Sequence, residues 1–287
     1  MSKYLSNAAV TEFDNEVKHQ YQGAGNLRNT VTVRNNVVGS TYKFSRMGKG
    51  MANQKATQAD VTPMDVTHTR PTATLENWNA PEYTDIFDAA EVNFDEKQEL
   101  AMTIAKALSR REDQLIIDAM NGVSYAATND LNPDTGRLID VSASANFTIA
   151  ALRTARAHFQ DIEADPADQH IALQADALQN LLSDSTVTSS DYNVVKALVN
   201  GDLNQYMGFT FHVIGTRSEG GLPGVTGDEI AFAWHKPAIG LAIGIDMKTT
   251  IDWVAQKTSW LANGMLKAGV AIREAQGICK IVYDETA

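Results

Sequence analysis

Few residues in this sequence are combined in a way that could carry out chemistry. Gly48 and Lys49 resemble the end of a phosphate-binding loop, in which backbone amides and a lysine hold the phosphates. That loop needs Ser or Thr after the lysine and an earlier glycine, but this chain has Gly50 and Lys43 at those places. The motifs G-x-S-x-G, H-E-x-x-H and C-x-x-C are absent from the sequence. The sequence therefore indicates neither a phosphate-binding loop nor a familiar hydrolytic site.

A short acidic segment resembles the start of a calcium-binding loop. Asp130, Asn132 and Asp134 alternate as the oxygen ligands of such loops do. Pro133 lies inside the segment, however, and Thr135 occupies the place of the required glycine. We therefore interpret the segment as a solvated turn rather than a metal site.

The histidines and the single cysteine suggest no reactive site either. No two histidines stand at metal-ligand spacing within one expected element, so we interpret them as ordinary surface or strand residues. They are His19, His68, His158, His170, His212 and His235. Cys279 lies in an alternating apolar run and has no second cysteine with which to form a disulfide. We expect no enzyme activity, no cofactor and no bound metal.

The composition is that of an acidic globular protein. The 287 residues are 44% hydrophobic, which is enough for a core, and the length predicts about two domains. With 24 basic and 35 acidic side chains, the net charge of −11 argues against binding DNA regardless of sequence. No apolar run approaches the roughly 20 residues of a membrane-spanning helix, and no signal peptide is evident. We expect a soluble protein that folds in the cytoplasm and contacts no membrane.

Charge is unevenly distributed along the chain. Residues 1–80 carry a net charge of +3, and residues 81–287 carry −14. The basic candidates for contact with a neighbouring subunit are Arg34, Lys43, Arg46, Lys49 and Lys55. The acidic candidates are Glu82, Asp85, Asp88, Glu91, Glu96 and Glu99. If copies assemble, we expect the basic segment of one to lie across the acidic surface of the next, which would steer association and set its register. The alternative is two solvated faces that pair locally within one chain.

The first 80 residues are too poor in large apolar side chains to form a core of their own. They begin with an amphipathic pattern whose apolar residues recur at spacings of three and four. This stripe is formed by Val10, Phe13, Val17 and Tyr21. Thr- and Val-rich runs at 30–44 and 61–75 flank a glycine-rich segment and predict one long hairpin. Because a lone hairpin is marginal in water, we expect it to reach over a neighbouring subunit, or alternatively to pack on its own domain.

The strongest helix signal covers residues 95–121. Asp95 with Gln98 resembles a capping box, apolar residues keep one helical face, and Gly122 ends the helix. At 1.5 Å per residue this is a rod of roughly 40 Å, which suits a spine for a sheet and an arm. A loop is expected at 122–145, and an α/β pattern follows it. The expected helices are 149–159, 176–182 and 192–199, and the expected strands are 170–173, 209–213, 229–234, 238–245, 248–254, 265–272 and 277–283.

Several segments, taken in order, resemble the major capsid proteins of tailed phages. They are Val38-Gly-Ser-Thr-Tyr-Lys-Phe44, Gly48-Lys-Gly50, Asp60-Val-Thr-Pro-Met-Asp-Val-Thr-His68, Pro81-Glu-Tyr-Thr-Asp-Ile-Phe87, Asp95-Glu-Lys-Gln-Glu-Leu100, Asp113-Gln-Leu-Ile-Ile-Asp-Ala119, Ser189-Ser-Asp-Tyr-Asn-Val-Val-Lys-Ala-Leu-Val-Asn-Gly201 and Met207-Gly-Phe-Thr-Phe211. The likeness covers most of the chain, and its weight comes from the shared order rather than from any single motif.

The resemblance implies the α+β Hong Kong 97-like capsid fold. Its parts would be an N-terminal arm at 1–27, an extended β-hairpin loop at 28–75, a peripheral domain at 76–142 with the spine helix at 95–121, an axial domain at 143–239, peripheral-domain strands at 240–272 and a C-terminal strand at 273–287 that returns to the axial domain. The implied function is structural. Pentamers and hexamers would self-assemble in the host cytoplasm into an icosahedral virion capsid around the double-stranded DNA of a tailed bacteriophage.

The resemblance also implies partners. These are further copies of the chain, a portal, a separate scaffolding protein and packaged DNA contacted weakly without sequence specificity. The resemblance leaves open whether a decoration protein binds the shell. No covalent crosslink is expected, because no asparagine and glutamate can be matched to Lys49 or Lys55. The nearest alternative is an encapsulin-like shell that encloses enzymes. More distant alternatives are an uncharacterised α/β hydrolase and a nucleic-acid binder with a basic arm.

Overall fold

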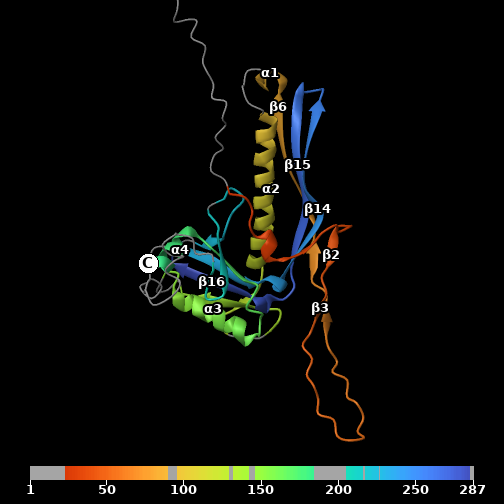
Figure 1. Cartoon of the computed structure of the whole chain (residues 1–287), viewed down its shortest axis with the longest axis vertical. Coiled ribbons are helices and arrows are strands. Elements are labelled where there is room, and N and C mark those ends of the chain that lie inside the picture. The colour runs from red at the N-terminus through yellow and green to blue at the C-terminus, as the bar shows by residue number, and fades with distance from the viewer. Residues whose placement is uncertain are drawn as a thin grey trace, which may run out of the picture.

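The chain folds around two β-sheets joined by a long helix, with a loop that projects away from both (Figure 1). The computed structural model describes residues 23–89, 96–128, 132–141, 146–183, 205–215, 217–225 and 227–284. Helices and strands are both well represented, so the α+β expectation is confirmed. Within the described residues, no helix is both long and apolar enough to span a membrane.

The first sheet is narrow and long. Its order is β1-β14-β15-β6, with β1 parallel to β14 and the other pairs antiparallel. The bounds are β1 Thr32–Arg34, β6 Glu76–Asp85, β14 Ile239–Val254 and β15 Ser259–Ile272. Strands β14 and β15 form one long hairpin beside the helix (Figure 1).

Helix α2, Glu96–Asn121, packs along this sheet and is the spine of the structure. Its 26 residues give a length of about 39 Å. It lies where the sequence predicts a helix over 95–121. Close approach to β15 depends on Gly264, because a Cβ at that position would overlap the side chain of Ile104 and lie 2.9 Å from that of Leu108.

Strand β6 was not predicted, and its composition explains why. Its residues are mostly polar or acidic, and Pro81 has no N–H to give to a ladder. Pairing with β15 over the whole strand nevertheless forms it, and its place at the sheet edge tolerates the proline. The short helix α1, Ile86–Ala89, follows it directly.

The second sheet holds most of the remaining strands. Its order is β10-β11-β9-β13-β16-β8-β7, and β12 also pairs with β13. The bounds are β7 Tyr125–Ala126, β8 Gly136–Asp140, β9 Gln169–Leu173, β10 Gln205–Tyr206, β11 Phe209–Val213, β12 Gly224–Val225, β13 Asp228–His235 and β16 Ile278–Asp284. Two helices belong to this half, α3 Ile149–Asp161 and α4 Ala175–Ser183. Thr148 caps α3 by accepting a hydrogen bond from the amide of Ala151.

Three local expectations were wrong. The predicted loop at 122–145 contains β7 and β8, because β8 finds a parallel partner in β16. The strands expected at 238–245 and 248–254 are one strand, β14, with register irregularities between Ile243 and Lys248. The run at 30–33 is not part of the projecting hairpin, since β1 pairs with β14 instead. The helix expected at 192–199 lies outside the described residues.

The projecting hairpin is confirmed in its paired lower part. Strand β2, Thr41–Lys43, pairs with β5, Thr72–Thr74, and β3, Arg46–Met47, pairs with β4, His68–Thr69. Beyond Gly48 the two sides run to the tip without strand pairing (Figure 1). Every residue from Lys49 to Asp65 is exposed, so the tip is not packed on its own chain.

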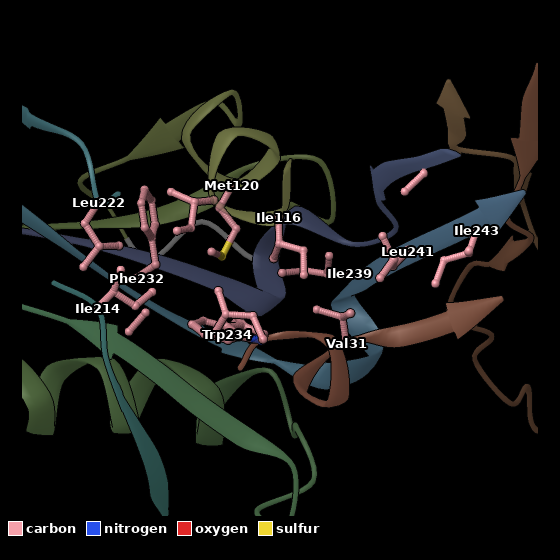
Figure 2. Close-up of a cluster of buried hydrophobic side chains, with 14 of the residues drawn as sticks. Val31, Ile116, Met120, Ile214, Leu222, Phe232, Trp234, Ile239, Leu241 and Ile243 are labelled. Carbon is pink, nitrogen blue, oxygen red and sulfur yellow. The ribbon is translucent and has the colours of Figure 1, made fainter. Parts of the chain in front are cut away.

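One hydrophobic cluster joins the first sheet, α2 and the second sheet (Figure 2). Trp234 is fully buried in it, and its indole N–H donates to the carbonyl of Thr30 over 3.0 Å. The chain crosses between the sheets at two adjoining 3-10 turns, η3 Lys236–Ala238 and η4 Ala275–Gly277. This shared core fixes how the two sheets sit on the helix.

Candidate interaction surfaces

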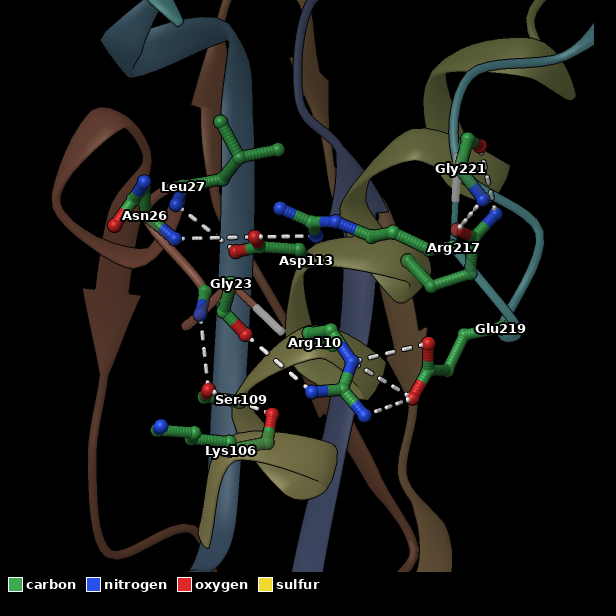
Figure 3. A network of polar contacts seen from close by, with 12 residues as sticks. Gly23, Asn26, Leu27, Lys106, Ser109, Arg110, Asp113, Arg217, Glu219 and Gly221 are labelled. Atoms are coloured by element: carbon green, nitrogen blue, oxygen red, sulfur yellow. Dashed lines mark hydrogen bonds and ion pairs between the residues drawn. The ribbon is translucent and has the colours of Figure 1, made fainter. Parts of the chain in front are cut away.

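One turn of α2 binds residues 23–27, which are the root of the N-terminal segment (Figure 3). The amides of Asn26 and Leu27 donate to the two carboxylate oxygens of Asp113 over 3.0 and 2.9 Å. The amide of Gly25 donates to the hydroxyl of Ser109 over 2.9 Å. A side chain at Gly25 would overlap the backbone carbonyl of Ser109, so the contact requires glycine. Asp113 is 1% exposed, and the two backbone amides compensate the loss of water around its carboxylate.

The same turn is held from the other side by residues 217–221 (Figure 3). Arg217 donates to the Asp113 carboxylate over 2.9 Å, and Arg110 pairs with Glu219 at 3.0 Å. The amide of Gly221 donates to the side-chain carbonyl of Gln114 over 2.8 Å. Thus α2 is clamped between the root of the N-terminal segment and a loop of the second sheet.

A third contact ties this root to the first sheet. Arg28 in the turn η2, Arg28–Thr30, binds Asp246 with two hydrogen bonds of 2.8 Å. Its Nε also lies 3.5 Å from a carboxylate oxygen of Glu112. Glu112 is 2% exposed, and neither of its oxygens has a hydrogen-bond partner among the described residues. Burial raises the pKa of Glu112 to about 7, opposed in part by the charge of Arg28. The hydrogen bonds from Arg28 lower the pKa of Asp246.

The root of the projecting loop is attached to the body through Arg46. Its guanidinium donates to the carbonyls of Pro133 and Arg273 over 3.3 and 3.1 Å, and it pairs with Asp134 at 2.8 Å. It also donates to the hydroxyl of Thr69 in the opposite strand over 2.9 Å. Of the five predicted basic contacts, this one is engaged within its own chain. Arg46 therefore sets the direction of the loop.

The other four basic candidates are exposed. They are Arg34, Lys43, Lys49 and Lys55. Arg34 lies in β1 of the first sheet, whereas the three lysines lie on the projecting loop together with exposed apolar side chains, namely Met47, Met51, Val61 and Met64. A loop that presents both cations and methionines to solvent has the composition of a contact surface.

The acidic candidates lie at the opposite end of the molecule. Figure 1 shows α1 and the end of β6 at one extreme of the long axis, with the loop tip at the other. Glu82 is exposed, while Asp85 and Glu99 are half-buried. Asp88 and Glu96 lie in α1 and at the start of α2, and their side chains are outside the described part, as is the whole of Glu91. The loop tip of one chain therefore cannot lie on the acidic end of that chain.

Exposed apolar side chains also gather near the acidic end. Phe87 is 72% exposed, and Trp253 near the tip of the β14–β15 hairpin is 43% exposed. Trp253 meets Trp260 edge-on at 5.3 Å between ring centroids. The ammonium of Lys257 stands 3.8 Å above the ring of Tyr83. This end therefore offers aromatic as well as acidic contacts. The predicted apolar stripe of Val10, Phe13, Val17 and Tyr21 lies outside the described residues.

The residues that the sequence singled out for possible chemistry do not form a reactive site within the part of the chain that the structure describes. Asp134 pairs with Arg46, and Lys49 is exposed without the glycine loop that phosphate needs. His170 and His212 meet on adjacent strands, with ring nitrogens 3.2 Å apart. Burial lowers the pKa of His170 to about 4, so the pair is neutral near pH 7. Across the described ranges, no three potential metal ligands come together. Cys279 is buried, and burial raises the pKa of its thiol.

Sequence reasoning missed the polar turn of α2, although a signal was present. Ile104, Leu108 and Ile116 recur every four residues on the buried face, and Glu112 occupies the missing place in that series. An acid within an apolar helical stripe must be buried with a partner or change its protonation. The partner, Arg28, lies 84 residues earlier in the chain, and no periodicity connects the two.

Comparisons with known proteins agree with this architecture. The profile of a family described as phage capsid protein matches residues 5–285. The fold is similar to the capsid of the cyanophage P-SCSP1u, with a TM-score of 0.78 and 15% identity over 98% of this chain and 94% of that one. It is also similar to a Mycobacterium phage Che8 structure (TM-score 0.71, 14% identity, 95% and 97% covered). A third similar structure is the head of Helicobacter pylori bacteriophage KHP40 (0.73, 12%, 99% and 97%). No curated protein matches the sequence.

Proposed function

The chain belongs to the phage capsid protein family, and we propose that its copies form the pentamers and hexamers of an icosahedral shell through the charged surfaces at its two ends. It is a structural major capsid protein and not an enzyme. The encapsulin alternative is not favoured, because the matching family and the similar structures named above are those of phages. The finer statements that follow concern how this particular chain assembles.

The observation that carries the proposal is the separation of the two charged surfaces. The loop beyond Gly48, which carries the exposed Lys49 and Lys55, and the acids of the β6–α1 end lie at opposite extremes of one molecule (Figure 1). Contact between them needs two copies, and repetition of a head-to-tail contact closes a ring when the rotation allows it. Opposite charge would steer this contact and select its register more than it adds affinity.

The described elements also support a division of the chain into domains. We propose that β2–β5 belong to an extended loop at 28–75, that α2, β6, β14 and β15 form a peripheral domain from 76–142 and 240–272, and that the second-sheet strands β9–β13 and β16 form an axial domain from 143–239 and 273–287. Strand β1 of the first sheet and strands β7 and β8 of the second sheet do not follow this division. The N-terminal arm would be 1–27. The clamp around Asp113 would then hold arm, peripheral domain and axial domain at a single turn of the helix.

The remaining proposed partners follow from a shell that packages a genome in the host cytoplasm. They are a portal, a separate scaffolding protein, and double-stranded DNA contacted weakly and without sequence specificity. A net charge of −11 per chain supports the last of these, since an acidic lining repels phosphate and does not retain the incoming DNA.

Purification of the protein followed by electron microscopy tests the proposal. Wild-type protein produced together with its scaffolding protein should yield closed shells, and all variants are compared under the same conditions. A variant with Arg34, Lys43, Lys49 and Lys55 changed to Gln should assemble poorly, and high salt should weaken wild-type assembly in the same direction. Arg46 is left intact because it holds the loop within its own chain. Changing the exposed Arg153 on α3 to Gln is the control and should leave shells unaffected. Normal shells from the fourfold variant would contradict the role of the loop.

A further inference from the structure

The outer half of β14 is an open sheet edge. Strand β1 covers only Gly240–Ala242 on that side, while β15 pairs with β14 on the other side as far as Val254. Among the residues that the structure describes, none pairs with Lys248–Val254 along the open side. Such an edge presents a row of backbone donors and acceptors, and it is a template for another strand.

The side chains along this edge alternate in character. Thr249 and Ile251 stand opposite Gly264 and Ala262 of β15, so they share the sheet face that α2 covers. Ile251 and Trp253 on this face remain partly exposed, at 40% and 43%. Lys248 and Asp252 point to the other face and are exposed. An added strand would thus meet an apolar row on one face and a cation and an anion on the other.

We propose that this edge pairs with the same edge of a second copy, antiparallel about a two-fold axis at Thr250. The proposal rests on the assembly into shells proposed above, and it names a contact separate from the loop. In this register Lys248 of each copy stands opposite Asp252 of the other, so two ion pairs form. Met247 stands opposite Trp253 on the apolar side. Such opposite-charge and apolar cross-strand pairs stabilise antiparallel sheets.

Neighbouring registers are worse for identifiable reasons. A two-fold axis perpendicular to the sheet places the same face of both copies on the same side. Residues that stand opposite each other must then lie on the same face of the strand, so the axis passes between the two copies of one residue. Centring it on Lys248 sets two lysines against each other. Centring it on Thr249 sets Asp246 against Asp252, and centring it on Ile251 leaves both charges without a partner. The axis at Thr250 is the register within this segment that pairs Lys248 with Asp252.

Crosslinking tests the pairing directly. In the Thr250→Cys variant, the introduced thiol faces its copy across the axis, and native Cys279 is buried and will not compete. A short bis-maleimide linker applied to assembled shells should convert most chains to covalent dimers on a denaturing gel. The matched control is Thr154→Cys on the exposed face of α3, which should stay monomeric. Normal shells in which Thr250→Cys reacts but does not dimerise would overturn the inference and leave the shell function standing.

Charge reversal provides an independent test. Lys248→Glu places acids opposite each other twice, and Asp252→Lys does the same with lysines, so each single variant should assemble several-fold less well. The double variant restores opposite charges and should recover wild-type assembly. Single variants that assemble normally, or a double variant no better than either single one, would show that another segment or solvent covers this edge. Absence of shells from the wild-type protein produced together with its scaffolding protein would instead refute the proposed function.

Discussion

Replacing Glu112 by Gln should stabilise the unassembled chain at pH 8 and leave its stability unchanged near pH 4.5. Glu112 is buried at the junction of α2, the N-terminal root and β14, and both its oxygens lack hydrogen-bond partners among the described residues. The charges that act on it are those of Arg28, Asp246 and Asp113. Arg28 is already engaged by Asp246 with two hydrogen bonds, so it only partly compensates Glu112. Glutamine keeps the shape of the side chain and removes the charge.

The magnitude follows from the pKa of Glu112. It rises from 4.5 to about 7, and a difference of this size corresponds to about 3 kcal/mol. Because the folded chain binds the proton more tightly than the unfolded chain, folding loses stability as pH rises from about 4.5 to about 7. Above about pH 7 the folded chain bears the full free-energy cost of burying the ionised carboxylate of Glu112. The expected gain from Glu112→Gln is therefore absent at pH 4.5 and approaches about 3 kcal/mol at pH 8.

Urea unfolding of both proteins across this pH range measures the effect, with the midpoint and slope fitted at each pH. The exposed Glu76→Gln in β6 is the control and should shift stability little at any pH. Hydrogen exchange of residues 23–34 should slow in the Glu112→Gln variant at pH 8. A difference between wild type and variant that is equal at both ends of the pH range, or a variant less stable at pH 8, would refute the reasoning.

Three further variants test other parts of the structure. Gly25→Ala should free the root of the N-terminal segment from Ser109, and proteolysis before residue 30 should become faster; unchanged cleavage would contradict the close contact. Gly264→Ala pushes the side chain of Ile104 away from β15 and should lower the free energy of unfolding by about 1–3 kcal/mol, measured with urea; a neutral result would mean that α2 can shift freely. Arg46→Gln should leave folding intact by circular dichroism but increase hydrogen exchange at β3 and β4, because the loop root loses its contacts with the body.

Sequence patterns predicted the regular parts of the fold well. The apolar helical face from Leu100 to Ile117 predicted α2, and the alternation at Phe209–Val213 predicted β11. These signals are local, because a buried face leaves its period in the sequence. The opposite signs of charge in the loop and in the segment after it also indicated two contact surfaces, and the structure separates them in space.

The features that escaped prediction depend on partners distant in sequence. Strand β6 is acidic and contains Pro81, and only its pairing with β15 makes it a strand. The irregular register near Ile245 broke β14 into two apparent strands. The contacts of Asp113 and Glu112 join segments that are about 80 residues or more apart, so no local pattern could reveal them. The limits of the proposed domains stay predictions for the same reason.

The most direct test of the central claim is carbodiimide crosslinking of shells assembled from equal parts of light and isotopically heavy protein. If the loop of one copy lies across the acidic end of the next, Lys49 or Lys55 should be joined to Glu82 or Asp85, with mixed light–heavy pairs as frequent as random association gives. Peptide mass spectrometry resolves these pairs. Crosslinks confined to chains of a single isotope, or loop lysines joined to acids elsewhere, would contradict assembly through the two ends of the molecule.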